Sequence, residues 1–464
     1  MPSTFLGINI GASGLAASQL GQDVTGNNIS NANTPGYSVE SANFQANGPL
    51  SAPDSIAGSL PNGQIGTGVS VNSITRAQDQ YLSNQLRAGN GTLGLQTAQS
   101  DALQQIENAY GEPSDNGLNA ALTSFFQGFN NVANNPEDLG VRSTAIQNGV
   151  TLTNAFQSIG AQLDGVGAQL SQKAASDVQT INSYGTQIAA LNATIRASNV
   201  AGQQPNDLLD QRDQLLDKLS SLANINVLNN SDGTVNVSIA TTDLVVGVDA
   251  NAVTVAGLQA RGDLQSGDLA GVAQAQTSLQ NNRTALNNLA AAVAAQVNSV
   301  HSAGAGLDGS TGLNFFSVTS GNEAATISVN PALLSDPSKL AAAQAPATPG
   351  AAPAPGDAAV ATQLANLQNL SLTSGPLAGK TLIGYYQETV TDAGAQAATA
   401  QTAQSSAQAS VTQLSNQRDS ITGVSTDTEL TNMMRYQRAY QASARFVQTQ
   451  DDMLNTLITG LFSS

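Results

Sequence analysis

The sequence contains no cysteine and no tryptophan, and it has a single histidine, His301. Without cysteine the chain can form neither a disulfide nor a thiolate metal site, and it has no cysteine nucleophile. One histidine cannot supply the histidine pair of a typical zinc site. We interpret His301 as a residue that caps a helix or packs at its end. The sequence therefore predicts no cofactor, no metal and no enzymatic activity.

Charged residues are also scarce, at 10% of the chain against about 25% in typical soluble proteins. The net charge of −17 argues against nucleic acid as a partner, because nucleic-acid binding needs clustered Lys and Arg. It argues equally against binding to an anionic membrane surface. A neutral-polar surface suits subunits packed side by side, because buried amides can be hydrogen-bonded while buried charges are costly. A low-charge extracellular protein explains the composition equally well.

Long hydrophobic runs are missing too. No stretch approaches the roughly 20 apolar residues of a membrane-spanning helix. The beginning of the sequence lacks the positive region of a secretory signal, since the first basic residue is Arg76. If the protein leaves the cell, we expect it to do so without a cleaved signal peptide.

Helical periodicity covers most of the chain. Apolar residues recur at helical spacing over about 93–223, over about 270–300 and again from about 383, and a helix is expected to resume around Arg76. Long helices with few breakers are typical of a bundle or rod. The sequence predicts a mainly α fold, an elongated helical rod or bundle in which coiled-coil helices at the two ends pair.

The segment 224–262 has a different pattern. Val235, Val237 and Ile239 alternate with polar residues behind Asp232-Gly233, which predicts a β-hairpin. Valines between 245 and 255 predict further strands. The expected organisation therefore has a terminal helical assembly domain (1–70 with 420–464), a helical rod domain with a Pro/Ala linker at 345–358 (71–223 with 263–419), and a small β region in the middle (224–262).

The two terminal segments carry the most regular patterns. Over 4–33, four residues follow coiled-coil spacing before Thr34-Pro35-Gly36 ends the helix. Over 430–461, positions alternate in steps of three and four, and most are apolar. These positions form the predicted assembly interface: Ile10, Ala17, Leu20, Val24, Leu430, Met433, Tyr440, Ala444, Val447, Leu454, Ile458 and Leu461.

The last helix could dock on the core of its own domain, or it could form a coiled coil with the first helix and with neighbouring copies. Twelve apolar side chains contribute roughly 1.5–3 kcal/mol each when fully buried. Ordering about 60 residues costs on the order of 1–2 kcal/mol per residue. The two helices alone fall short and need a third surface. Neighbouring copies would supply that surface, and the ends would then become ordered on assembly.

Gly7, Gly11 and Gly14 are spaced four and three residues apart. This is not a dinucleotide-binding fingerprint, and no strand precedes them. We interpret them as small residues that let two helices approach closely.

Two segments resemble signatures shared by the bacterial flagellar axial proteins, which are the rod, hook and hook-associated proteins. They are NNISNANTPGYS at 27–38 and TELTNMMRYQRAYQASARFVQTQDDMLNTLI at 428–458. Flagellin is less similar, because its N-terminal pattern lacks the Thr-Pro-Gly-Tyr stop. Within the group, the middle resembles the hook-associated proteins of the hook–filament junction. Supporting runs include GTGVSVNSITRAQDQYLSNQLR at 66–87, LLDQRDQLLDKLS at 208–220 and VNSVHSAGAGLDGSTGLNFF at 297–316.

The resemblance covers most of the chain and is weakest at 230–262 and 340–360, so the family's larger outer β domain is expected to be reduced or missing. It implies a structural subunit of the extracellular flagellum, exported through the flagellar type III channel and needed to attach the filament. The terminal helices would line the inner tube. The implied partners are other copies of the chain in a ring or layer, the hook protein, the second junction protein and an export chaperone at the C-terminal helix.

Two alternatives remain open at this point. The chain could be another axial subunit, a hook or filament protein. It could also be an adhesin or enzyme on a helical stalk, with its site in the β region. The single histidine argues against the adhesin or enzyme alternative, and so does the absence of a convergent acid/base cluster in the sequence.

Overall fold

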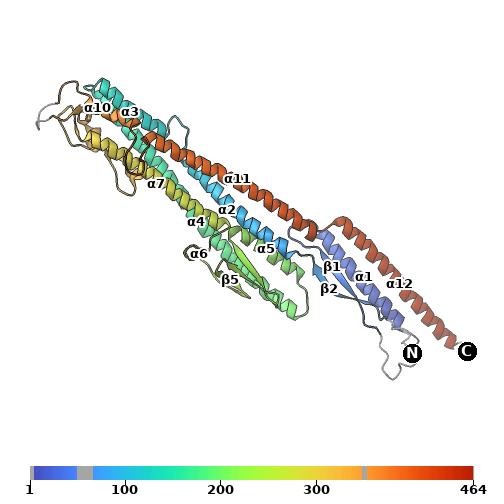
Figure 1. Ribbon diagram of the computed structural model, residues 1–464. Coiled ribbons are helices and arrows are strands. Elements are labelled where there is room, and N and C mark those ends of the chain that lie inside the picture. Colours follow the sequence, from blue (N-terminus) through green and yellow to red (C-terminus); the bar gives the residue numbers. More distant parts are fainter. Residues whose placement is uncertain (1–4, 50–65, 347–352, 463–464) are drawn as a thin grey trace. The chain divides into compact units, whose positions relative to one another are not determined.

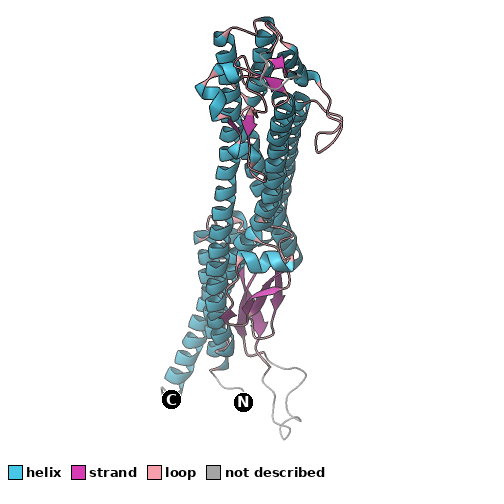
Figure 2. Ribbon diagram, turned by 90° about the vertical axis from the view of Figure 1, so that its left-hand side faces the viewer, coloured by secondary structure: helices cyan, strands magenta, loops and turns pink. Residues whose placement is uncertain are grey.

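The structure is a computed structural model that describes residues 5–49, 66–346 and 353–462. Helix accounts for 67% of the residues and strand for 9%, which confirms the predicted mainly α fold (Figure 2). Of the predicted Pro/Ala linker, residues 347–352 lie outside the described residues.

Long helices dominate the chain, and the strands are short (Figure 1). The helices are α1 Leu6–Ser30, α2 Gln80–Tyr110, α3 Leu118–Asn134, α4 Leu139–Val200, α5 Asn206–Leu222, α6 Val255–Arg261, α7 Asp268–His301, α8 Glu323–Thr326, α9 Pro331–Ser335, α10 Ala359–Asn366, α11 Leu382–Thr422 and α12 Thr426–Phe462, with 3-10 turns η2 Pro337–Lys339 and η3 Leu367–Asn369. The strands are β1 Glu40–Ala46, β2 Val69–Arg76, β3 Ile225–Asn229, β4 Val235–Ile239, β5 Thr242–Val246, β6 Asp249–Ala250, β7 Gly304–Ala305, β8 Phe316–Ser317, β9 Ser328–Val329 and β10 Ala343–Gln344.

The chain forms two compact units, and each is described by itself. Unit 1 comprises Met1–Gly91, Thr180–Asp263 and Ala409–Ser464, and unit 2 comprises Thr92–Gln179 and Leu264–Gln408. The boundary between the units falls within α2, α4 and α11. The three-part domain division drawn from the sequence stays a prediction.

In unit 1, β3 to β6 form a four-stranded antiparallel sheet in sequential order. The alternation in β4 buries Val235, Val237 and Ile239, as the sequence predicts. Behind them, the buried Asn192 of α4 donates hydrogen bonds to two backbone carbonyls of the sheet region, those of Val235 and Gly247.

The strand prediction for the later valines is wrong. Val248 lies in the turn between β5 and β6, Val253 lies in the loop after β6, and Val255 begins the helix α6. The preceding Thr254 caps this helix, because its hydroxyl accepts a hydrogen bond from the Gly257 N–H. Gly262 ends the helix in the left-handed conformation, with φ of 68°. These local capping signals outweigh the β propensity of a single valine.

The other part of unit 1 contains the two terminal helices. Helix α1 packs against α12 on one side and against the β1–β2 hairpin on another (Figure 1). The hairpin is antiparallel, and its strands join the end of α1 to the start of α2. Helix α2 begins at Gln80 rather than near Arg76, because Asp79 accepts a hydrogen bond from the Leu82 N–H and so caps the helix.

Unit 2 has an aromatic core. Phe125, Phe126 and Phe129 of α3 meet Phe315 and the first residue of β8, Phe316, with each ring no more than 1% exposed. Neighbouring ring centroids in this cluster lie 4.7–5.8 Å apart, mostly edge to face. The predicted apolar face of α3 therefore forms the centre of this unit.

His301 packs at the end of α7, as predicted. Its Nδ1 lies 2.7 Å from the carbonyl oxygen of Leu313, and its Nε2 accepts a hydrogen bond from the Ala341 N–H at 3.0 Å. The ring also meets Phe315 edge to face. Burial lowers the pKa of His301 to about 4, so the ring is neutral at pH 7.

Candidate functional site

The residues predicted for assembly on α1 are all buried or half-buried. Ala17 and Val24 are buried, and Ile10 and Leu20 are half-buried. They share a helix face with Ser13, whose hydroxyl accepts a hydrogen bond from the Val69 N–H of β2. Ser13 thus contacts the hairpin, while the role of the four predicted residues in assembly stays a prediction.

A row of small residues lines the contact with α12. A Cβ added at Gly11 would come within 2.4 Å of Val447 Cγ2, and one added at Gly14 within 2.8 Å of Ser443 Oγ. A Cβ at Gly21 would lie 2.9 Å from the Tyr436 ring. The absence of side chains lets the two helices approach closely, which confirms the sequence interpretation of the first glycines of this row.

On α12 the predicted residues fall into two groups. Met433, Ala444, Val447 and Leu454 are half-buried. Exposed fractions are 51% for Leu430, 39% for Tyr440 and 52% for Ile458. The side chain of Leu461 lies outside those described. The role of these residues in assembly stays a prediction.

The N-terminal signature forms the end of α1 and the turn at 31–37 that follows it, which we call the signature turn. Asn28, in the last helical turn of α1, is fully buried. Its Nδ2 donates to the Glu40 carbonyl at 2.8 Å and to Glu429 of α12 at 2.9 Å. Its Oδ1 accepts from the Glu40 N–H at 2.9 Å and from the Tyr37 hydroxyl at 2.8 Å. The side-chain amide of Asn28 in α1 is thus hydrogen-bonded to both β1 and α12. Burial raises the pKa of the Glu40 carboxyl and that of the Tyr37 hydroxyl.

The same turn docks on α5. Asp210 accepts hydrogen bonds from the Ser38 N–H and the Ser38 hydroxyl, both at 2.9 Å. Gln214 donates to the Pro35 carbonyl at 3.0 Å. Gly36 between them has φ of 77°, a conformation that favours glycine.

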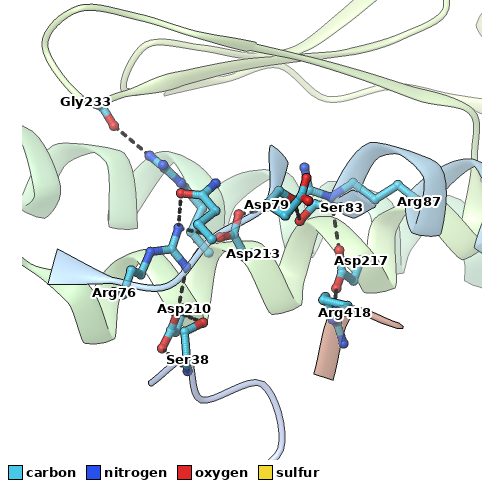
Figure 3. A network of polar contacts seen from close by, with 12 residues as sticks. Ser38, Arg76, Asp79, Ser83, Arg87, Asp210, Asp213, Asp217, Gly233 and Arg418 are labelled. Atoms are coloured by element: carbon cyan, nitrogen blue, oxygen red, sulfur yellow. Dashed lines mark hydrogen bonds and ion pairs between the residues drawn. The ribbon is translucent and has the colours of Figure 1, made fainter. Parts of the chain in front are cut away.

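Three arginines and three aspartates extend this contact into an alternating ladder, which we call the Arg–Asp ladder (Figure 3). The aspartates lie three and four residues apart on α5, so they share one helix face. The arginines come from β2, α2 and α11. In order, the ladder runs Asp210, Arg76, Asp213, Arg87, Asp217 and Arg418, with ion-pair distances of 2.6, 2.6, 3.0, 3.0 and 2.6 Å.

The ladder is only partly open to solvent. Side-chain exposures of its first ion pair, Arg76 with Asp210, are 8% each. Burial lowers the pKa of Arg76, but Asp213 and Asp210 outweigh it and raise that pKa above its ordinary value. The outer pair, Arg418 with Asp217, is 25% and 20% exposed. The ladder therefore acts as a cross-link between segments that are distant in sequence.

Sequence reasoning did not predict this ladder. The run at 208–220 served only as a point of family resemblance, although the spacing of its aspartates already indicates one acidic helix face. Within the described residues, no group of three or more His, Cys, Asp or Glu side chains could hold a metal ion. In the same part of the chain, no helix combines the length and apolar character needed to cross a membrane.

Comparisons with known proteins first define the class. Residues 8–37 match the family model "Flagella basal body rod protein", and residues 416–460 match "Flagellar basal body rod FlgEFG protein C-terminal". These are the segments that form the glycine-lined helix pair and the signature turn. The terminal segments thus define an axial protein of the bacterial flagellum.

Residues 103–316 match the helical domain of flagellar hook-associated protein FlgK. Flagellar hook-associated protein 1 of Bacillus subtilis is 30% identical, with 99% of each chain covered. The same protein of Salmonella typhimurium is 28% identical over 560 positions, covering 97% of this chain and 99% of the relative. The chain belongs to the flagellar hook-associated protein 1 family and is a structural protein of the flagellum.

The fold agrees with this assignment. The flagellar hook junction protein FlgK from Burkholderia pseudomallei is similar in structure with a TM-score of 0.64, covering 73% of this chain and 100% of that one. Its sequence identity is 18%, so this likeness supports the fold alone. The 560-position alignment with the Salmonella protein exceeds the 464 residues of this chain, so that relative carries segments that this chain lacks.

Proposed function

We propose that this chain is a hook–filament junction subunit whose paired helices α1 and α12 form the assembly surface between copies. The observation that carries the proposal is the exposure of α12. Among its described side chains only Glu429 is buried. Helix α7, by contrast, buries fourteen residues. A helix with so little burial is marginal in water and needs further partners.

The exposed part of α12 is apolar. Its exposed large hydrophobic residues include Leu457 at 56%, Met453 at 48% and Phe446 at 42%. These three are spaced four and seven residues apart, so they share one side of the helix. Such an apolar surface is typical of a protein–protein contact. We expect it to be covered by neighbouring copies, with the hook protein and the second junction protein as the adjoining layers.

Before assembly the same surface is an aggregation hazard. We therefore propose that an export chaperone covers α12 in the cytoplasm, and that the subunit leaves through the flagellar export channel without a cleaved signal peptide. The function is mechanical and not catalytic. In support, each carboxylate of the Arg–Asp ladder pairs with an arginine, and the ladder joins segments of the chain.

The first experiment is deletion of the gene in a motile cell. A junction subunit is required after the hook is built, so hooks should remain and unattached filament protein should appear in the medium. A strain without hooks would show instead that the chain acts earlier, as another axial subunit.

The second experiment tests the surface itself. Leu457→Asp places a charge on the exposed side of α12 and should leave hooks without filaments. Val200→Asp is the matched control, because Val200 is 87% exposed at the end of α4 and outside the terminal helices. Normal filament attachment in the Leu457 variant, or equal loss in both variants, would rule out α12 as the assembly surface.

A further inference from the structure

We propose that unit 1 has an oxyanion-binding site, distinct from the assembly surface, that takes a carboxylate or phosphate group. The site is a cleft of about 340 Å³ between the start of α2, α5 and the β3–β4 hairpin. We call it the arginine cleft, because Arg76, Arg87 and Arg212 all line it. Asp213 is the one carboxylate among its lining residues.

Arg212 is the strongest evidence. It is only 6% exposed, and its Nη1 donates to two neutral acceptors, the Gly233 carbonyl at 2.7 Å and Asn192 Oδ1 at 3.1 Å. No carboxylate pairs with it among the described residues. Its Nε is buried there without a hydrogen-bond partner. A buried charge without a counter-charge is costly, and an anion in the cleft would relieve that cost.

Arg76 and Arg87 add to the same positive field. Both pair with Asp213, and each has a second carboxylate partner, Asp210 for Arg76 and Asp217 for Arg87 (Figure 3). Arg76 Nε is likewise buried without a partner among the described residues. The lining thus holds three guanidinium groups and one carboxylate, and among the described residues Arg212 is the one of the three without a carboxylate partner.

The chemistry of the lining defines the ligand class. A guanidinium group is planar and pairs through two parallel N–H groups with carboxylate or phosphate oxygens. Gln78, Gln80 and Asn84 line the same cleft, and their side-chain amides are neutral donors. The lining therefore suits a compact oxyanion better than an apolar or cationic ligand.

The test is a titration of the full chain with phosphate and, separately, with acetate at constant ionic strength, followed through the ¹⁵N–¹H signals of the arginine Nε–H groups. We expect saturable shifts of the Arg212 and Arg76 signals, assigned with single Arg→Lys variants. A response to acetate alone assigns a carboxylate ligand, and a response to phosphate alone assigns a phosphate ligand.

Two variants that each add one negative charge, one at the arginine cleft and one away from it, test whether the anion binds in the cleft. Asn84 is exposed and lines the cleft, so Asn84→Asp should weaken anion binding about tenfold by repulsion. Asn416→Asp on α11 makes the same charge change at an exposed position outside the lining and should bind as the wild type does. Absence of saturable shifts with both anions, or equal affinity in the wild type and the Asn84 variant, would overturn the proposal.

Discussion

At the scale of single residues, Asp210 holds the signature turn in place. Its two oxygens accept from the Ser38 N–H, the Ser38 hydroxyl and Arg76 Nη1. It thereby links the turn after α1, the end of β2 and the helix α5. Because Asp210 and Arg76 are both mostly buried, neither can exchange its partner for water without a large cost.

We therefore expect Asp210→Asn to lower the free energy of unfolding by about 1.5–3 kcal/mol, the usual cost of losing a hydrogen bond to a charged group, because Arg76 keeps its ion pair with Asp213. Urea unfolding followed by circular dichroism measures this change. Asp419→Asn is the control, because Asp419 is 61% exposed and lies 3.7 Å from Arg418. It should change stability by no more than about 0.5 kcal/mol. Equal effects of the two variants would contradict the structural role given to the ladder.

His301 gives a prediction about pH. Its pKa is lowered to about 4 by burial, whereas an unfolded chain has the ordinary value of 6.5. Between these values the unfolded chain binds a proton that the folded chain does not. The contribution of the neutral His301 to the free energy of unfolding therefore has its full value above pH 6.5. It is lost as the pH falls from 6.5 towards 4, a loss of about 3 kcal/mol in all.

The chain has one histidine, so its C2–H signal in a proton NMR spectrum needs no assignment. We expect that signal to titrate with a midpoint near pH 4 while the protein stays folded. A midpoint near 6.5 would show that the His301 ring is open to water and would contradict the burial described here.

The sequence could predict part of the site at this scale. The aspartate spacing on α5 and the Thr-Pro-Gly-Tyr stop after α1 are both visible in the sequence. The partners are not, because Arg76, Arg87 and Arg418 come from three separate segments of the chain. Spacing along one helix predicts which residues share a face, but it does not say what that face meets.

At the scale of elements, periodicity predicted the long helices and the buried face of β4. It also predicted that the two terminal helices pair, and α1 does pack against α12, with glycines of α1 facing α12 at the closest approach. Hydrophobic periodicity detects the face that is buried by large side chains. A contact made by small residues leaves no apolar signal, and it was visible only as glycine spacing.

Gly11→Ala tests that contact. The added methyl group would meet Val447 at 2.4 Å and push α1 away from α12, weakening the pair by about 1–3 kcal/mol. Gly26→Ala on the same helix has no atom within 4 Å and should preserve or strengthen the helix. The measurement is the amount of each variant retained on isolated flagella. Equal retention of the two variants would show that close approach at Gly11 is not required.

At the scale of the whole molecule, burial is distributed unevenly between the last helix, α12, and the other long helices. Unit 2 has an aromatic core, and α7 is buried along its length. Helix α12 buries only Glu429 among its described side chains. This difference is the physical basis of the proposal that the terminal helices become stable only when copies assemble.

The most direct test is amide hydrogen exchange, measured on the free monomer and on isolated flagella. We predict that α1 and α12 exchange much faster than α7 in the monomer, and that they become protected in the flagellum. If α1 and α12 of the free monomer were protected as strongly as α7, the terminal helices would be stable without neighbours, and assembly-coupled ordering would be wrong.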